Sequence, residues 1–182
     1  IVIVKQLFGG LGQNFVNPAL AGRAFLLASY PSIMTNWVTP GADAVSTATP
    51  LALLKAGNIA DLPSITDAFL GNIGGTIGET CALALIIGGI YLIWRGVISW
   101  RMPVIYIATV FVLTALIGRS GVRMPVYELF VGGLMLGAFF MATDYATSPI
   151  TPAGQIIMAV GCGILTTLIR IFGGYPEGVS YS

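Results

Sequence analysis

Long stretches without a charged residue are the feature that most restricts what this chain can fold into. Five such stretches divide it, at residues 24–42, 80–94, 102–118, 129–143 and 145–169. Only 8% of the 182 residues are charged and 56% are hydrophobic, whereas about 25% of an ordinary soluble domain is charged. So few charges cannot cover a water-facing surface. The sequence therefore predicts an all-α polytopic membrane protein, a transmembrane helix bundle whose outer surface faces lipid.

The uncharged stretches also predict where the helices lie. A helix that spans a bilayer needs roughly 20 mostly apolar residues, and the segments that meet this need lie near 76–95, 103–119, 125–142 and 154–172. Another membrane helix is expected at 18–30 if it continues into 31–38, because Asn17 followed by Pro18 is typical of a helix start. We treat residues 1–182 as a single membrane domain and as a piece of a longer protein, incomplete at both ends.

Two glycine-rich segments interrupt the apolar pattern. They are "GGLGQN" at 9–14 and "GNIGGTIGET" at 71–80, and each leads into an apolar helix. Glycines of this kind serve close helix packing, or they mark broken helices whose N-terminal amides point into a cavity, as in transporters built from inverted repeats. Both interpretations remain open, and the similarity of the two segments hints at an internal repeat.

One long polar loop is predicted at residues 35–67. Its last residues, Ser64 to Asp67 in "SITD", resemble a capping box that begins the next helix. The short loops "RGVISWRMP" and "GRSGVRMP" each carry two arginines, so the positive-inside rule does not give the orientation in the membrane. The loop at 35–67 is the part of the chain where chemistry outside the membrane is expected.

Composition excludes several kinds of chemistry. The chain has no histidine, so a Ser/His/Asp triad and imidazole metal sites are impossible, and no dinucleotide-binding or P-loop pattern is present. A net charge of +1 gives no reason to expect a nucleic-acid partner. Cys81 and Cys162 lie within apolar stretches and are expected to be buried, inert thiols. A cluster shared across a subunit interface remains an alternative for them.

Four charged residues in or near the apolar segments are candidates for function. Glu79 and Glu128 lie near predicted helix N-termini, where the helix dipole favours a carboxylate, whereas Asp144 lies at a helix C-terminus, where the dipole disfavours it. Acidic residues at membrane depth are candidates for an ion path, and capping or packing is the structural alternative. Arg23 can extend its charged end to the membrane surface, pair with a loop carboxylate, or meet an anionic cofactor group.

The loop contains "DAVSTATP", residues 43–50. Serine and threonine hydroxyls often bond to nearby backbone, so a capped turn is one interpretation. The alternative is the pattern that flavin transferases recognise, with Asp43, Ser46 and Ala48 as recognition residues and Thr49 as the acceptor. Thr47 stands where that pattern usually has glycine.

Further segments carry a resemblance to a known family. They are "FGGLGQNFVNPALAGRAFLLASYP", "GNIGGTIGET", "FFMATDYATSPITPAGQ" and "GGYPEGVSYS". Together with the loop motif they resemble the RnfD family of the Rnf complex, which is related to the NqrB family of the sodium-pumping NADH:quinone reductase. The resemblance runs from about residue 9 to the end and covers the C-terminal half of such a protein. It implies glycine-broken helices in an inverted repeat similar to that of urea and ammonium transporters.

The resemblance also implies a function. The chain would relay electrons in an ion-translocating ferredoxin:NAD⁺ oxidoreductase of a prokaryotic cell membrane, with FMN bound covalently to Thr49 and a non-covalent riboflavin. The implied partners are the other membrane, flavin and iron–sulfur subunits, a flavin transferase, and sodium ions or protons. The loop would be extracytoplasmic, and Arg23 and Lys55 could neutralise the FMN phosphate. A secondary transporter or channel without a redox cofactor, or a purely structural membrane subunit, are the alternative functions.

Overall fold

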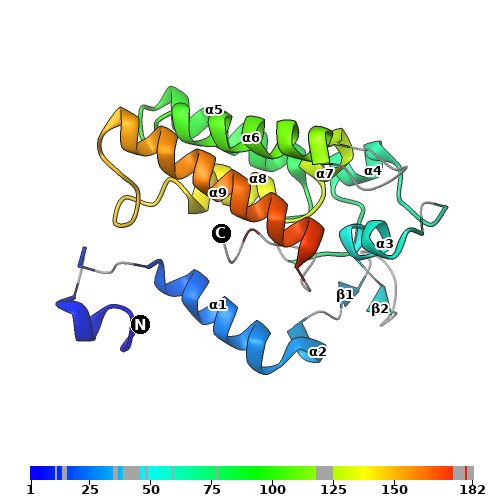
Figure 1. Ribbon diagram of the computed structural model, residues 1–182, viewed down its shortest axis with the longest axis horizontal. Helices are drawn as coiled ribbons and strands as arrows, with labels where there is room; N and C mark the ends of the chain where they lie inside the picture. Colours follow the sequence, from blue (N-terminus) through cyan, green and yellow to red (C-terminus); the bar gives the residue numbers. More distant parts are fainter. Residues whose placement is uncertain are drawn as a thin grey trace.

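The computed structural model describes most of the chain. The described residues are 1–10, 12–13, 16–34, 37–38, 46–47, 49–58, 60–76, 78–117, 125–173 and 179. They are mostly helical, in agreement with the predicted class, apart from one pair of two-residue strands (Figure 1).

The elements follow one another along the chain as η1 (Gln6–Phe8), α1 (Pro18–Ser29), α2 (Pro31–Met34), β1 (Trp37–Val38), β2 (Ser46–Thr47), α3 (Pro50–Ala56), α4 (Ile65–Leu70), α5 (Ala82–Trp94), α6 (Arg101–Ile117), α7 (Pro125–Phe130), α8 (Leu134–Leu136), the π-helical segment η2 (Gly137–Met141) and α9 (Pro152–Phe172). The strands β1 and β2 pair antiparallel. The predicted polar loop at 35–67 therefore contains the strand pair, the whole of α3 and the start of α4.

Side chains that accept backbone N–H bonds fix several helix starts. The Asn17 side chain accepts bonds from the N–H groups of Ala19 and Leu20 at the start of α1, which confirms the predicted cap. The Ser64 hydroxyl accepts a bond from Asp67 N–H at the start of α4, so the helix predicted to begin at "SITD" is also confirmed. Each such cap satisfies a donor that the helix itself leaves without a partner.

The predicted membrane helices differ from the observed ones in length and continuity. Only α9 is long and apolar enough, among the described residues, to cross a membrane by itself, and it matches the segment predicted at 154–172. The helices α5 and α6 are shorter apolar helices. The helix predicted at 125–142 is wrong as a continuous helix: it is divided into α7, α8 and η2. Its break contains Gly132, whose φ of +77° is a left-handed conformation that interrupts a right-handed helix.

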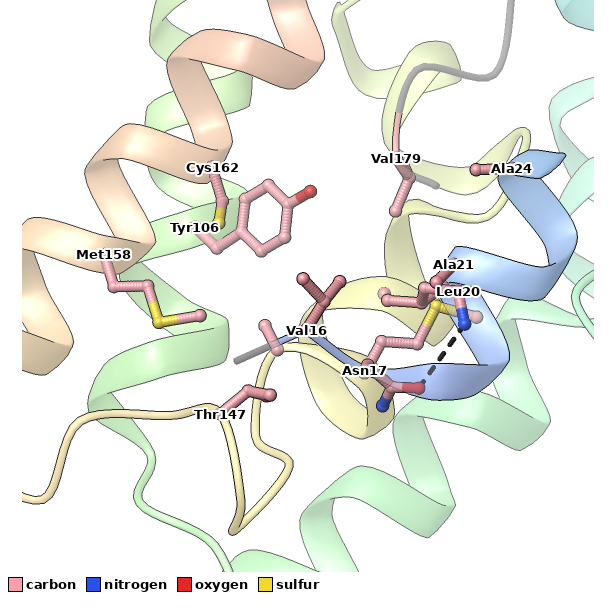
Figure 2. A pocket seen from close by; sticks show the side chains of 13 residues that line it. Val16, Asn17, Leu20, Ala21, Ala24, Tyr106, Thr147, Met158, Cys162 and Val179 are labelled. Atoms are coloured by element: carbon pink, nitrogen blue, oxygen red, sulfur yellow. Dashed lines mark hydrogen bonds between the residues drawn. The ribbon is translucent and has the colours of Figure 1, made fainter. Parts of the chain in front are cut away.

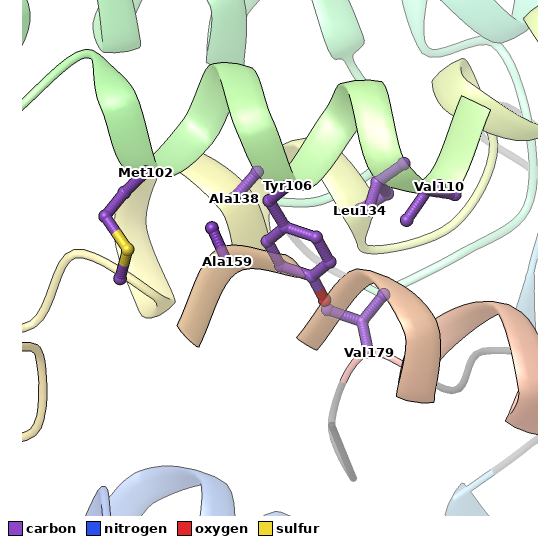
Figure 3. Close-up of a cluster of buried hydrophobic side chains, with 7 residues drawn as sticks. All are labelled: Met102, Tyr106, Val110, Leu134, Ala138, Ala159 and Val179. Atoms are coloured by element: carbon purple, nitrogen blue, oxygen red, sulfur yellow. The ribbon is translucent and has the colours of Figure 1, made fainter. Parts of the chain in front are cut away.

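The main core lies where α6 packs against α9, and the two helices run side by side in Figure 1. Figure 3 shows the cluster of buried side chains, which are Met102, Tyr106, Val110, Leu134, Ala138, Ala159 and Val179. The Tyr106 hydroxyl lies 2.6 Å from the Thr166 hydroxyl, so the buried polar tip of this ring has a partner on α9. Gly163 allows the close approach, because a Cβ there would lie 2.7 Å from the Thr109 Cβ.

The outer faces of these helices are apolar as well. Trp94 on α5 is 80% exposed and Ile157 on α9 is 73% exposed. Leu116 on α6 and Phe172 on α9 are exposed too. Large apolar side chains spread over the outside of three helices are what a lipid-facing surface requires.

Candidate functional site

Thr49, the predicted flavin acceptor, occupies the position before the first residue of α3. Its backbone is extended, with φ −63° and ψ 149°, and its Oγ1 accepts a bond from Ala52 N–H at 3.3 Å. Pro50 follows as the first helical residue, where a missing N–H costs nothing. Thr49 is only 7% exposed. The sequence pattern Thr-Pro therefore forms a helix start that holds the hydroxyl at the edge of a packed region.

The other residues of the flavin motif are described less fully. Asp43 and Ala48 lie outside the described residues. Ser46 is in β2, where it pairs with Val38, and its side chain is outside the described part as well. The proposal that these three residues are recognised by a flavin transferase stays a prediction.

Glu79 is almost completely buried, with 3% of its side chain exposed. It lies in the turn between α4 and α5, and its Oε2 forms an ion pair with Arg23 of α1 at 3.4 Å. A second Arg23 nitrogen donates to the Thr76 hydroxyl at 3.3 Å. The predicted pairing of Arg23 with a carboxylate is therefore found, and its partner belongs to the second glycine-rich segment.

A small cavity of about 10 Å³ connects Thr49 with Glu79. The lining comes from α3, from the segment between α4 and α5, and from the break after α7; it consists of Thr49, Pro50, Leu51, Ile73, Gly74, Gly75, Glu79, Thr80, Val131 and Gly132. Two glycines of this break, Gly132 and Gly133, pack closely against residues that line the cavity. A Cβ at Gly133 would lie 3.1 Å from Glu79 Oε2, and a Cβ at Gly132 would lie 2.5 Å from Leu51 Cδ1.

Arg170 is a buried charge that sequence reasoning missed. It lies in the last turn of α9, is 5% exposed, and donates to the carbonyl oxygens of Glu128 at 2.9 Å and Val131 at 3.4 Å. It thereby holds the C-terminal end of α7, where carbonyl groups lack helical partners. The signal for it was present, because Arg170 directly ends the uncharged stretch 145–169. Glu128 contributes its main-chain carbonyl to this contact.

Asp144 follows η2, and its surroundings differ from those of Glu79. Its Oδ2 accepts bonds from Asn17 Nδ2 at 3.4 Å and from Thr147 Oγ1 at 3.3 Å. Asn17 also caps α1, so the carboxylate ties the start of α1 to the turn that follows η2. Asp144 does not line the cavity beside Thr49.

A second, larger cavity of about 400 Å³ lies between α1, α6, η2 and α9 (Figure 2). Its wall is mostly apolar, with side chains such as Val16, Leu20 and Met158, and it also includes Asn17 and Thr147. Cys162 lines this cavity, whereas Cys81 packs against Gly71. Neither cysteine forms a disulfide within the described residues. The same part of the chain contains no group of three or more acidic or cysteine side chains that could hold a metal ion.

The structure thus brings some of the predicted site residues together and separates others. Thr49 and Glu79 line one cavity, and Arg23 reaches that cavity through its ion pair. Asp144 lies elsewhere, and Glu128 contacts Arg170. The proximity of Thr49 to Glu79 was not predicted from the sequence.

Comparisons with known proteins place the chain in a family. A sequence model of the NQR2, RnfD, RnfE family matches residues 1–182. The chain is 60% identical to the D component of the Na⁺-translocating ferredoxin:NAD⁺ oxidoreductase complex of Acetobacterium woodii. It is 49% identical to the D component of the proton-translocating ferredoxin:NAD⁺ oxidoreductase complex of Clostridium ljungdahlii, and 35% identical to that of the ion-translocating oxidoreductase complex of Pseudomonas paraeruginosa. All of this chain is covered in each comparison, but it spans only 57%, 59% and 60% of those relatives. The match over the whole chain shows that it belongs to the NQR2, RnfD, RnfE family.

Proposed function

We propose that the chain is the flavin-bearing part of a membrane subunit that relays electrons in an ion-translocating ferredoxin:NAD⁺ oxidoreductase of a prokaryote. The observation that carries the proposal is the 60% identity, over the whole chain, to a protein named as the D component of such a complex. The motif that ends in Thr49 adds to it, because a transporter or channel has no use for a flavin acceptor. The exposed apolar faces of α5, α6 and α9 support a location in the membrane.

The position of Thr49 at the start of α3 supports the proposed phosphoester, whereas the adjoining cavity is too small for a flavin ring. Its Oγ1 lies at the start of α3, an end of a helix at which an anionic group is favoured. The adjoining cavity of about 10 Å³ has room for little more than one water, so the flavin ring belongs outside it. Thr49 is also nearly buried. We therefore expect the transferase to act before α3 packs into place, or on a locally opened chain.

The cofactors and partners of the proposal follow from the family. FMN on Thr49 would supply one-electron and two-electron redox chemistry, and the chain would supply its position. A non-covalent riboflavin, a flavin transferase that reads Asp43, Ser46 and Ala48, and flavin and iron–sulfur subunits of the complex complete the proposal. The loop that bears Thr49 would face the outside of the cell, and the membrane helices would form an inverted repeat. Arg23 forms an ion pair with Glu79, and Lys55 donates to the Gly173 carbonyl, so each would have to leave its present partner to reach the phosphate.

The transported ion is left open by the relatives, because one is named as sodium-translocating and another as proton-translocating. Glu79, Glu128 and Asp144 are the proposed ion-path residues. The burial of Glu79 favours its inclusion, since a buried carboxylate has to be paired or protonated. The contact of the Glu128 carbonyl with Arg170 favours a structural role for that segment.

The flavin part of the proposal is tested on the full-length protein, produced together with a flavin transferase. The denatured band should fluoresce under ultraviolet light, because a covalent flavin survives denaturation. Asp43→Ala should lower the fluorescence per protein if the transferase reads Asp43. Absence of fluorescence from the unsubstituted protein would support the transporter alternative. Full flavin loading of Asp43→Ala would show that Asp43 serves only the turn.

Asp144→Asn tests the ion-path part. The asparagine keeps the shape and can still accept a bond from Asn17, but it removes the charge. We expect coupled ion transport to slow, or the required ion concentration to rise, while Thr49 still carries flavin. The measurement is ferredoxin:NAD⁺ activity in vesicles, titrated with sodium and with pH. Unchanged dependence on both ions would restrict Asp144 to the structural tie between α1 and the turn after η2.

A further inference from the structure

The Glu79 carboxylate has one oxygen that the rest of the described chain leaves unsatisfied. Oε2 is paired with Arg23 at 3.4 Å, whereas Oε1 is buried and has no hydrogen-bond partner. Buried polar atoms nearly always have a partner, and a buried carboxylate oxygen without one is costly. An unsatisfied oxygen on a side chain that is only 3% exposed is a place for a small partner such as a water, a proton or a cation.

The space beside Glu79 limits what this partner can be. The cavity of about 10 Å³ holds a single water-sized particle. Besides Glu79, its lining includes the hydroxyl residue Thr80 and the glycines Gly74, Gly75 and Gly132, together with Thr49 and apolar side chains. Carboxylate, hydroxyl and carbonyl oxygens are the ligands that hard cations prefer. A water, a dehydrated monovalent cation or a proton on Oε1 fits the size of this cavity, and the negative charge of Glu79 favours a cation.

The contact between Arg23 and Glu79 is a weak form of ion pair. A single Arg23 nitrogen reaches a single carboxylate oxygen at 3.4 Å, longer than the roughly 2.7–2.9 Å of a good charge-assisted bond and without the two-point geometry of a strong pair. The Arg23 side chain is 22% exposed, and another of its bonds goes to the Thr76 hydroxyl. The proposal requires Arg23 to move away from Glu79 toward Thr76 while the buried carboxylate stays in place.

Arg23 and Arg170 both bring positive charge close to the cavity. A mobile cation would therefore have to compete with Arg23 for Glu79. Arg170 approaches from α9, since one of its nitrogens would lie 3.3 Å from a Cβ at Gly132, and carbonyl oxygens of α7 and the following break hold it there. Lys55 on α3 is bonded to the Gly173 carbonyl, and Glu128 lies on α7. A mobile cation beside Glu79 would meet the charges of Arg23 and Arg170 together, so it can enter only when Arg23 withdraws.

We propose that Glu79, Thr80 and the adjoining glycine segment form a site for one monovalent cation, sodium or a proton, and that Arg23 is a tethered counter-ion which competes with it. Cation binding displaces Arg23 from the carboxylate, and cation release lets it return. The proposal rests on the proposed function in one respect: it supplies the ion-binding step of an ion-translocating complex. Because the site adjoins the proposed flavin-bearing residue, a charge at Thr49 would be felt at Glu79.

The test is the thermal unfolding of the full-length protein in detergent. Sodium chloride is titrated at constant ionic strength against choline chloride, and pH is varied separately without sodium. In Arg23→Gln the competitor is gone, so the cation concentration that gives half of the stabilisation should fall about tenfold or more. Glu79→Gln, alone or combined with Arg23→Gln, should remove the dependence. Arg95→Gln, which removes an exposed arginine at the end of α5, is the matched control and should behave as the native protein.

The two arms distinguish the sources of the cation. Stabilisation by sodium at constant pH identifies a sodium site, and stabilisation by acid alone that disappears in Glu79→Gln identifies protonation of Glu79. If Arg23→Gln is unfolded in choline, rescue by sodium or by acid supports the site, and failure of both overturns it. The proposal is also overturned if Arg23→Gln responds like Arg95→Gln, or if the double variant keeps its cation dependence. No step of this test uses the flavin. A chain without FMN can therefore still show the cation dependence, and a flavin-loaded chain can lack it, so the two proposals fail independently.

Discussion

Thr49→Asn is expected to abolish covalent flavin and electron transfer through the protein while the chain still folds. Asparagine is among the best residues at the start of a helix, so it should replace the bond that Thr49 Oγ1 accepts from Ala52 N–H. It has no hydroxyl to form a phosphoester. The measurements are in-gel flavin fluorescence, ferredoxin:NAD⁺ activity of the assembled complex, and the thermal unfolding midpoint of the same sample.

Two further variants separate the roles of this hydroxyl. Thr49→Ser keeps both a helix cap and an acceptor, so it should retain flavin if the transferase accepts serine. Thr49→Ala should lose both, with a cost of about 1 kcal/mol in stability from the missing cap. Fluorescence that persists in Thr49→Asn would show that another residue bears the flavin. If Thr49→Asn does not fold while Thr49→Ser does, the main role of Thr49 is structural.

Gly71→Ala is expected to lower the stability of the chain substantially. Gly71 ends α4 with a φ of +91°, and a Cβ there would lie 2.9 Å from the Cα and Cβ of Cys81, just before α5. The left-handed conformation costs alanine about 1–2 kcal/mol. Overlap with backbone that cannot easily move adds about 1–3 kcal/mol. Because Glu79 lies on the segment between Gly71 and α5, the ion pair with Arg23 should weaken too.

Gly57→Ala is the matched control for this prediction. Gly57 ends α3 in the same conformation, with a φ of +81°, but a Cβ there would meet nothing within 4 Å. Only the conformational cost should appear, so chemical unfolding in detergent should give a clearly smaller loss than for Gly71→Ala. Equal losses in the two variants would contradict the close contact between Gly71 and Cys81.

Helix starts were predictable from the sequence because their causes are local. Asn17 before Pro18 and Ser64 before Asp67 carry their own hydrogen-bond acceptors, and both begin helices as expected. The break at Gly132 was missed because the apolar pattern of 129–143 continues through it, and a left-handed glycine leaves no mark in hydropathy. The helix α3 was missed because its seven residues are too few to show a period.

The candidate site was predictable only in part, for a similar reason. Glu79 and Arg23 could each be identified as unusual charges among apolar residues, and their partnership fits the rule that buried charges are paired. That Glu79 shares a cavity with Thr49 depends on how α3, the turn before α5 and the break after α7 pack together. Such contacts between distant segments follow from tertiary packing, which no single stretch of sequence specifies. Arg170 was missed because it ends a predicted membrane helix, where arginine commonly reaches the surface.

The central claim, a flavin on Thr49, is tested most directly by mass spectrometry of the native protein. Trypsin should release residues 24–55 as one peptide, since no lysine or arginine lies between Arg23 and Lys55. This peptide should be heavier by the mass of FMN less one water, and fragmentation should place the addition on Thr49. An unmodified peptide from transferase-treated protein, or an addition on Ser46 or Thr47 instead, would contradict it.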